Sequence, residues 1–169
     1  MTTEAHPPVQ GQSNMDLFRQ LSNAWPRGVA VVTTIDASGS PSGLTMRAVS
    51  PVSSDPLRYM ICVGEQSRSL KAILASQVFC INYLTADQQA LSDQFASRID
   101  DKFANVKTRR LNSGCLAIEG AAAVIECRVA HAISSGDHRL LIGDVTAAEV
   151  HDGDPLVIFG AGYRRLAAA

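Results

Sequence analysis

Residues 29–63 read VAVVTTIDASGSPSGLTMRAVSPVSSDPLRYMICV, and this stretch decides the fold. It begins with a run of β-branched and apolar residues, passes through a segment that carries Asp36, Gly39, Pro41 and Gly43, and continues with a second β-branched run. Two extended runs separated by turn-forming residues are typical of a β-hairpin. We therefore predict two adjacent antiparallel strands over the first twenty residues of this stretch.

The polar segment at residues 50–56, SPVSSDP, interrupts the pattern before residues 59–63 resume a strand. Two prolines and three serines make the segment unsuitable for a central strand. We predict a short polar loop held between two strands, where backbone amides and hydroxyls face a ligand. An ordinary β-meander with a serine-rich turn explains the same residues equally well.

Composition bounds the class of protein. The chain has 169 residues, 46% of them hydrophobic and 18% charged, with a net charge of −1. This describes one globular domain with its own core and no general attraction for nucleic acid or an anionic membrane. The apolar runs are far shorter than the roughly 18 residues of a membrane span, and the N-terminus lacks a signal-peptide pattern. We expect a cytoplasmic protein.

Neither the cysteines nor the histidines have the spacing of a metal site. The sequence has no C-x-x-C pair, and most of the cysteines lie in apolar runs, where a thiol behaves as a small hydrophobe. We predict reduced core cysteines and no bound metal. The residues are Cys62, Cys80, Cys115 and Cys127, with His6, His131, His138 and His151 on separate segments.

The N-terminal region divides into a tail and a helix. Residues 1–14 are rich in Pro, Gln, Ser and Thr and are predicted to form a flexible tail, which leaves one domain over residues 15–169. Asn14 or Asp16 can cap a helix that ends at Pro26 and packs onto some other surface. Its apolar positions, at helical spacing, are Leu17, Phe18, Leu21 and Trp25. Arg27, which follows, is expected to be solvated.

Residues 64–69, GEQSRS, join a strand to an amphipathic helix that contains Leu70, Ile73 and Leu74. The unpaired N–H groups and the positive dipole end of a helix attract phosphate, and Arg68 with two hydroxyls strengthens the attraction. The sequence therefore predicts a phosphate site here. Helix capping by Ser67 and Ser69 is an equally good reading of the same serines.

The remaining elements are mostly strands. Residues 78–84 predict a strand, Asp87 caps a helix through Phe95, and the basic cluster within 104–112 is read as a solvated loop. Residues 121–133 and the run after the turn at 134–137 predict a second hairpin, and residues 155–159 a last strand. Antiparallel strands with inserted helices indicate a barrel rather than a doubly wound parallel sheet.

Common catalytic motifs are missing from the sequence. No G-x-G-x-x-G follows a strand, no G-x-x-x-x-G-K-[ST] occurs, and no G-x-S-x-G nucleophile elbow is present. Paired carboxylates for acid–base work cannot be identified either. The residues alone therefore predict a barrel in which the N-terminus of one helix binds phosphate. They do not show whether the protein is an enzyme or a binding protein.

The ordered series of motifs resembles the short-chain NAD(P)H:flavin oxidoreductases, the reductase components of two-component flavin-dependent monooxygenases. The series runs over residues 16–163 and consists of FRQLSNAWPRGVAVVTT, G-L-T-x-x-A-V-x-x-V-S-x-D-P, S-x-S before a helix, FCINYL, LSDQFA, DKF, G-D-H and a closing tyrosine. The resemblance implies a mainly β fold with inserted helices, an antiparallel Greek-key split β-barrel that binds FMN. It also implies a homodimer with the flavin near the subunit interface.

The same resemblance assigns site residues by position. His138 is placed at the nicotinamide or flavin ring as the catalytic residue, with no metal. The positions implied to bind the cofactor are Thr45, Met46, Arg47, Ala48, Val49, Pro51, Val52, Ser67, Arg68, Ser69, Lys102, Phe103 and Tyr163. Many members have two serines at Arg47 and Ala48 and a threonine at Arg27. Arg47 is left with three roles: contact with phosphate, contact with the flavin pyrimidine edge, or selection of an unusual acceptor.

The implied activity is reduction of FMN or FAD by hydride from NADH or NADPH, with the reduced flavin passed to a separate monooxygenase. This chemistry belongs to the cofactors, which accounts for the missing acid–base pair. Two alternatives remain on the sequence. One is a related reductase with another acceptor, such as a corrinoid or a metal chelate, and the other is a non-enzymatic flavin-binding protein.

Overall fold

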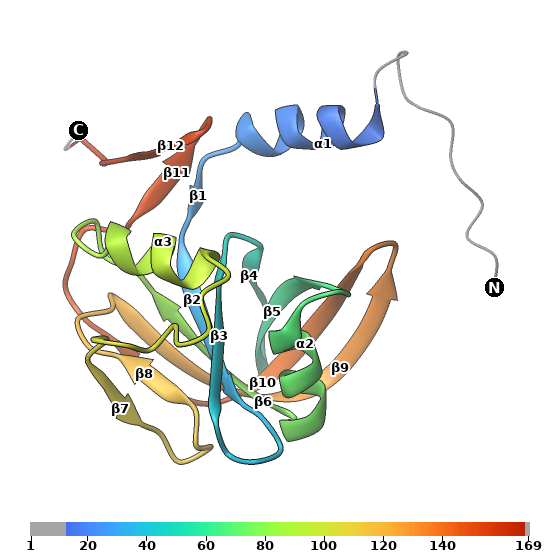
Figure 1. Ribbon diagram of the computed structural model, residues 1–169, viewed down its shortest axis with the longest axis vertical. Coiled ribbons are helices and arrows are strands. Elements are labelled where there is room, and N and C mark those ends of the chain that lie inside the picture. Colours follow the sequence, from blue (N-terminus) through green and yellow to red (C-terminus); the bar gives the residue numbers. More distant parts are fainter. Residues whose placement is uncertain (1–12, 168–169) are drawn as a thin grey trace.

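The computed structural model describes residues 13–167 (Figure 1), which form a curled sheet with helices and short strands around it. Seven antiparallel strands make up the main sheet in the order β3-β2-β6-β9-β10-β5-β4. The mainly β, antiparallel split-barrel fold is therefore confirmed. The strands are β2 (Ala30–Ile35), β3 (Pro41–Met46), β4 (Val49–Ser54), β5 (Leu57–Gly64), β6 (Val78–Tyr83), β9 (Ala123–Ser135) and β10 (His138–Val150).

The first predicted hairpin is formed by β2 and β3, whose register runs from Ala30 opposite Met46 to Ile35 opposite Pro41. Asp36 organises the turn, because its Oδ1 accepts hydrogen bonds from the backbone N–H groups of Ser38 and Ser40. The hairpin prediction is confirmed.

The polar segment after this hairpin is a strand, so the prediction of a loop at residues 50–56 is wrong. Residues 49–54 form β4, which pairs with β5 and turns back at the Asp55–Pro56 step. β4 lies at the edge of the sheet, where proline and polar side chains are tolerated. The register shifts between Pro51 and Ser53, which is the irregularity expected where a proline cannot donate.

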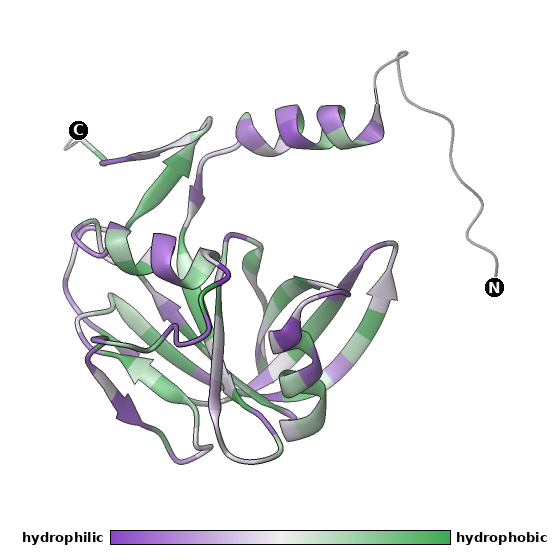
Figure 2. Ribbon diagram, viewed as in Figure 1, coloured by the Kyte–Doolittle hydropathy of each residue, from purple (hydrophilic) through white to green (hydrophobic). Residues whose placement is uncertain are grey.

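The core fills the interior of the curled sheet (Figure 2), where the strand residues are mainly apolar. Its fully buried side chains include Val32, Ile61, Phe79 and Leu141. A second buried cluster, at the helix α3 (Gln89–Ala96), contains Phe95 and Ile118. Cys80, Cys115 and Cys127 are buried as predicted, whereas Cys62 is only partly buried, so its placement in the core is wrong. Burial raises the pKa of the Cys127 thiol to about 12, so this thiol stays protonated.

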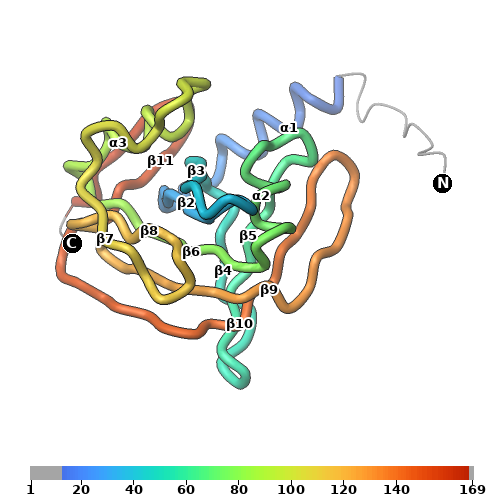
Figure 3. The backbone as a smooth tube through the Cα atoms, turned by 60° about the horizontal axis from the view of Figure 1, so that its bottom comes forward, coloured from blue at the N-terminus to red at the C-terminus, as the bar shows by residue number. Residues whose placement is uncertain are grey.

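The second predicted hairpin is confirmed as β9 and β10, each of 13 residues. Its base forms part of the main sheet, whereas its tip is exposed and lies beside the segment that precedes the helix α2 (Arg68–Ser76) (Figures 1 and 3). There the Glu65 backbone N–H donates to Asp137 O, and Arg139 forms an ion pair with Glu65 at 2.9 Å. The hairpin tip is thus fixed to the start of α2.

Three helices accompany the sheet: α1 (Asn14–Asn23), α2 (Arg68–Ser76) and α3 (Gln89–Ala96). α1 stands apart from the barrel (Figure 1) and buries none of its residues, so nothing within residues 13–167 provides the surface onto which the helix is expected to pack. Its cap is Ser13, not Asn14 or Asp16, and α3 begins after Gln88, not after Asp87. Of the predicted tail at residues 1–14, residues 1–12 lie outside the described part of the chain.

Two small sheets complete the fold. One joins β1 (Arg27–Gly28), β11 (Val157–Phe159) and β12 (Gly162–Arg164), and the other joins β7 (Thr108–Arg110) and β8 (Leu116–Ile118). The basic segment expected as a solvated loop is therefore partly a strand, and its Arg109 pairs with Glu149. None of the helices in residues 13–167 has the length and apolarity that crossing a membrane requires.

Candidate functional site

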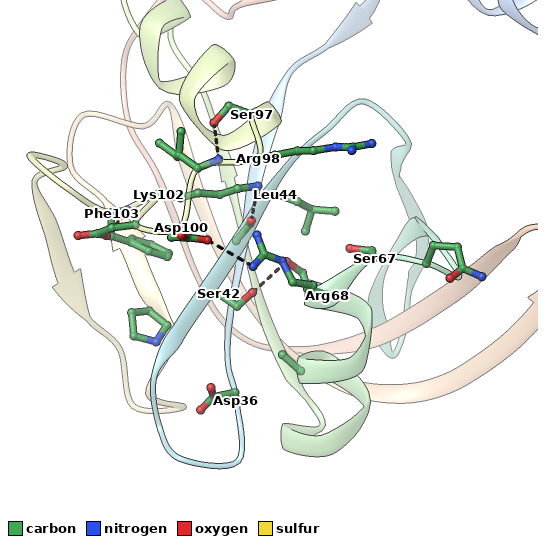
Figure 4. Close-up of a pocket in the computed structure, with 17 residues that line it drawn as sticks. Asp36, Ser42, Leu44, Ser67, Arg68, Ser97, Arg98, Asp100, Lys102 and Phe103 are labelled. Carbon is green, nitrogen blue, oxygen red and sulfur yellow. Dashed lines mark hydrogen bonds and ion pairs between the residues drawn. The ribbon is translucent and has the colours of Figure 1, made fainter.

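A cleft of about 970 Å³ lies along β3 (Figure 4). The residues before and at the start of α2 form one wall, the connector after α3 at residues 97–103 forms the other, and Ser42, Gly43 and Leu44 line the strand between them. Five of the positions implied by the resemblance meet here. They are Ser67, Arg68, Ser69, Lys102 and Phe103.

The two serines at the start of α2 have different surroundings. Ser67 is the N-cap residue by backbone conformation, yet its side chain makes no capping hydrogen bond. Ser69 is only 5% exposed, and its hydroxyl lies 3.0 Å from the hydroxyl of Ser42 on β3. The capping explanation therefore fails for Ser67, whose hydroxyl faces the cleft, whereas Ser69 ties the helix to the strand.

Two cations reach toward β3 from opposite walls (Figure 4). Arg68 comes from α2, and Lys102 comes from the connector, where its Nζ donates to Phe95 O at 2.7 Å and to Gly43 O at 3.4 Å. Burial lowers the pKa of Lys102, and the nearby charge of Arg68 lowers it further. Two like charges held near each other favour an anion between them.

The carboxylates of the cleft do little to neutralise these cations. Asp100 approaches Arg68 at 3.9 Å, but both side chains are well exposed, so the pair is weak. Asp101 accepts from the Phe103 backbone N–H, and Asp36 is engaged by the serines of the β2–β3 turn. The α2 side of the cleft therefore keeps its affinity for an anion.

Gly43 allows the connector to lie close to β3. A Cβ at this position would meet Phe95 at 2.8 Å and Phe103 at 3.3 Å. The two rings form an edge-to-face pair with centroids 5.0 Å apart, which fixes the segment that carries Lys102. Sequence reasoning did not single out Ser42, Gly43 or Phe95 as site residues, although Gly43 and Phe95 lie within motifs that it quoted.

A second cavity, of about 680 Å³, opens at the end of the barrel near α1. Trp25, Tyr59 and Tyr83 contribute apolar walls, and Arg27 and Arg47 contribute two guanidinium groups. Arg27 donates from Nη2 to Ser22 O at 2.6 Å, so it is not the simply solvated residue that the sequence predicts. Burial lowers the pKa of Arg27, and the charge of Arg47 lowers it further.

The segment at residues 45–52 contributes to the second cavity and to the sheet edge, and none of its residues lines the first cleft. The Thr45 hydroxyl donates to Ser92 O at 2.5 Å, and the Met46 side chain is buried in the core, which leaves its main chain as the part that can contact a ligand. Arg47 and Val49 line the second cavity. The other positions of this segment that the resemblance assigns to the cofactor are all exposed, and they are Ala48, Pro51 and Val52.

His138 and Tyr163 lie apart from the first cleft. His138 begins β10 opposite Gly64, and its Nδ1 lies 2.7 Å from the Asp137 carboxylate. The Tyr163 hydroxyl donates to Asp93 at 2.7 Å and lies 2.9 Å from the Ser92 hydroxyl at the start of α3. Burial raises the pKa of Tyr163, while nearby Arg47 opposes the rise. Neither residue lines the cleft.

Comparison with known proteins gives consistent matches. The model of the flavin reductase like domain family matches residues 22–167. A flavin reductase (NADH) of Kitasatospora aureofaciens is 39% identical over 154 residues, which are 89% of this chain and 81% of that protein.

Two solved structures are similar over most of both chains. Nitrilotriacetate monooxygenase component B of Mycobacterium thermoresistibile is 32% identical, with a TM-score of 0.87 over 91% of this chain and 87% of the other. The NADH:FAD oxidoreductase SgcE6 of Streptomyces globisporus C-1027, in complex with NAD and FAD fragments, is 29% identical, with a TM-score of 0.86 over 91% and 93%.

Proposed function

We propose, from the premise that this chain belongs to the flavin reductase like family, that it is an NAD(P)H:flavin oxidoreductase of a two-component monooxygenase system. It reduces FMN or FAD with NADH or NADPH and supplies the reduced flavin to a separate oxygenase. We assign the activity to one domain, residues 15–169. We place it in the cytoplasm, where reduced nicotinamides are formed and where free cysteines such as Cys62 stay reduced.

The observation that carries this proposal is the start of α2. The hydroxyl of Ser67 makes no capping hydrogen bond. The first N–H groups of α2 lie at the same end of the helix, and Arg68 and Lys102 bring two positive charges to the cleft. A flavin phosphate matches this combination of hydroxyl, helix dipole and cations. Ser69 supports the site through its hydrogen bond to Ser42.

The flavin ring is assigned to the far end of β3, along residues 45–52. β3 lies at the edge of the main sheet and pairs with β2 alone in the part of the sheet that the structure describes, so backbone groups along its other side are available to a planar ligand. We retain Thr45, Met46, Arg47, Ala48 and Val49 as main-chain or side-chain contacts of the ring. Pro51 and Val52 on β4 are assigned to its rim, with Tyr163 behind Thr45 through Ser92.

When bound, the flavin accepts a hydride from C4 of the nicotinamide, which provides the redox chemistry of the reaction. The residues of the chain bind and orient the two partners. Phe103, packed edge-to-face on Phe95, closes the wall of the first cleft and limits the access of water to the phosphate end of the flavin. We retain His138 as the nicotinamide contact that the resemblance implies, although the β9–β10 tip holds it beside the segment that leads to Ser67, at the phosphate end of the flavin.

Anaerobic mixing with FMN or FAD and each nicotinamide tests the proposal, with loss of flavin absorbance as the readout. We expect reduction by at least one nicotinamide. A flavin that binds but is not bleached by either nicotinamide would favour a binding protein, and reduction only of a corrinoid or metal chelate would favour the other alternative.

The phosphate assignment has its own test. Ser67→Ala should weaken FMN more than riboflavin, which lacks phosphate, while leaving the midpoint of urea unfolding unchanged, because no capping hydrogen bond is lost. Ser134→Ala, an exposed serine in β9, is the matched control. Equal losses for FMN and riboflavin in Ser67→Ala would refute a phosphate contact.

The role assigned to His138 is tested at matched flavin occupancy. His138→Ala should slow single-turnover reduction and raise the NAD(P)H concentration needed, with flavin affinity nearly unchanged. A single-turnover rate equal to that of the parent would remove His138 from the site.

We further propose that the protein is a homodimer. The apolar strand β6 offers no surface for a dimer contact, because it is central in the main sheet and its Phe79, Cys80 and Ile81 are fully buried. Support comes instead from α1, whose apolar residues are exposed, 61% for Phe18 and 64% for Leu21. A ten-residue helix without buried residues is not stable alone. Light scattering at micromolar concentration should give twice the chain mass, and Leu21→Glu should reduce it.

A further inference from the structure

Arg47 does not lie in the phosphate cleft. It follows the last residue of β3, its side chain is exposed, and it lines the cavity at the barrel end instead. Among residues 13–167, no carboxylate forms an ion pair with Arg47 or with Arg27 on the same cavity. Two guanidinium groups therefore share one cavity without a negative partner.

Arg27 is held in place more firmly than Arg47. Its Nη2 donates to Ser22 O, and its Nε is buried without a hydrogen-bond partner in the described part of the chain. Burying a polar donor without a partner costs free energy, and so does placing like charges side by side. Both costs fall when an anion enters the cavity, whose apolar walls include Tyr59 and Tyr83.

β3 gives a measure of the distance between the two cavities. Ser42 marks the phosphate end, since its hydroxyl meets Ser69 at the start of α2. Arg47 comes five residues later, and a strand rises about 3.3 Å per residue, which places it about 16 Å away along the strand. A ribityl chain and an isoalloxazine ring together extend over a comparable length. A flavin with its phosphate at Ser67 thus presents its ring to Arg47.

We propose that Arg47 stabilises the negative charge which the reduced flavin carries at its pyrimidine edge, and that Arg27 adds a second positive charge to the same cavity. The inference rests on the proposed function. In the reaction the nicotinamide C4–H bond breaks and a flavin N5–H bond forms. The two electrons of the broken bond travel with the proton, so the donor becomes cationic and the flavin anionic, and no further reactant is needed.

This charge gives the protein a preference for reduced over oxidised flavin. A hydrogen bond from a charged donor to an anion is stronger than one to a neutral carbonyl, by an amount on the order of a tenfold change in affinity. Arg47 therefore favours the product of hydride transfer and raises the reduction potential of the bound flavin. A tenfold affinity ratio corresponds to about 30 mV for a two-electron couple.

The test compares the dissociation constants of oxidised and of anaerobically reduced FMN in four variants. Arg47→Ser should lower the preference for reduced FMN about tenfold, with little change for oxidised FMN. Arg47→Lys should keep most of the preference, and Arg27→Thr should lose part of it. Arg128→Ser, an exposed arginine of β9 outside both cavities, should match the parent. Far-ultraviolet circular dichroism and the thermal midpoint report folding for each variant.

Two outcomes would overturn the inference. The first is an unchanged ratio of the two dissociation constants in folded Arg47→Ser, which includes an equal loss of affinity for oxidised and reduced FMN. The second is a loss of affinity for FMN relative to riboflavin in that variant, which would assign Arg47 to the phosphate. These outcomes leave the proposed function intact as long as the parent protein reduces flavin. A parent protein that reduces no flavin would refute the proposed function itself.

Discussion

Gly43→Ala should destabilise the domain and weaken flavin binding together. The added Cβ would lie 2.8 Å from Phe95 Cε1 and 3.0 Å from Cδ1, while ordinary contact begins at 3.4 Å, so the nearer atom must move by 3.4 − 2.8, or about 0.6 Å. Phe95 is fully buried and cannot swing into solvent. Overpacking of this kind costs about 1–3 kcal/mol.

The displacement should also reach Lys102. Phe103 packs on Phe95, and Lys102 Nζ is bound to the carbonyl oxygens of Phe95 and Gly43, so a shift of the ring moves the cation away from its place in the cleft. We expect the free energy of unfolding in urea to fall by about 1–3 kcal/mol and the affinity for FMN to fall more than that for riboflavin.

Gly28→Ala is the matched control, because a Cβ at Gly28 meets no atom within 4 Å. It should leave the unfolding free energy unchanged, and FMN affinity is compared with that of the parent because Gly28 lines the second cavity. If Gly43→Ala is as stable as Gly28→Ala and binds FMN as well as the parent does, the packing of the connector on β3 does not position Lys102.

Two further predictions concern the cleft and the core. Because burial and Arg68 lower the pKa of Lys102, raising the pH from 7 to 10 should weaken FMN relative to riboflavin at a lower pH than an ordinary lysine would, and Lys102→Arg should abolish this dependence. In the absence of ligand, raising the pH has the opposite effect, on stability. The folded state disfavours the charged amine, so the contribution of Lys102 to the free energy of unfolding increases with pH between its lowered pKa and the ordinary value. Asn82→Ala should cost about 2–4 kcal/mol in urea unfolding, since the buried amide donates to Val31 O and accepts from Ile118 N; a loss below 1 kcal/mol would contradict this.

The parts of the fold that the sequence predicts are those encoded by local pattern. The β2–β3 and β9–β10 hairpins have turn residues between β-branched runs, and both are present with their turns where the sequence indicates. β4 was missed because an edge strand exposed to solvent on much of its length carries no apolar alternation. β7 was missed for the same reason, since its arginines look like a solvated loop.

The same division holds for the site. The start of α2 was predicted because a serine and an arginine before an amphipathic helix are a local signal. The contacts of Ser42 with Ser69 and of Gly43 with Phe95 join positions 27 and 52 residues apart, which no local pattern reports. Likewise, the sequence offers three roles for Arg47, and the cavity that it shares with Arg27 is the observation from which we propose one of them.

The topology itself explains why a ligand site forms here. The two edges of the main sheet, β3 and β4, are consecutive in the chain and are joined only by Arg47 and Ala48. The sheet must therefore curl until its edges approach each other at this link, where the Cys62 N–H still donates to Ala48 O at 3.1 Å. Away from the link the edges diverge and leave backbone groups without strand partners. A planar ligand with hydrogen-bonding edges can occupy such a gap, so the flavin that we propose would extend from the link at residues 47 and 48 along the free edge of β3 toward Ser42.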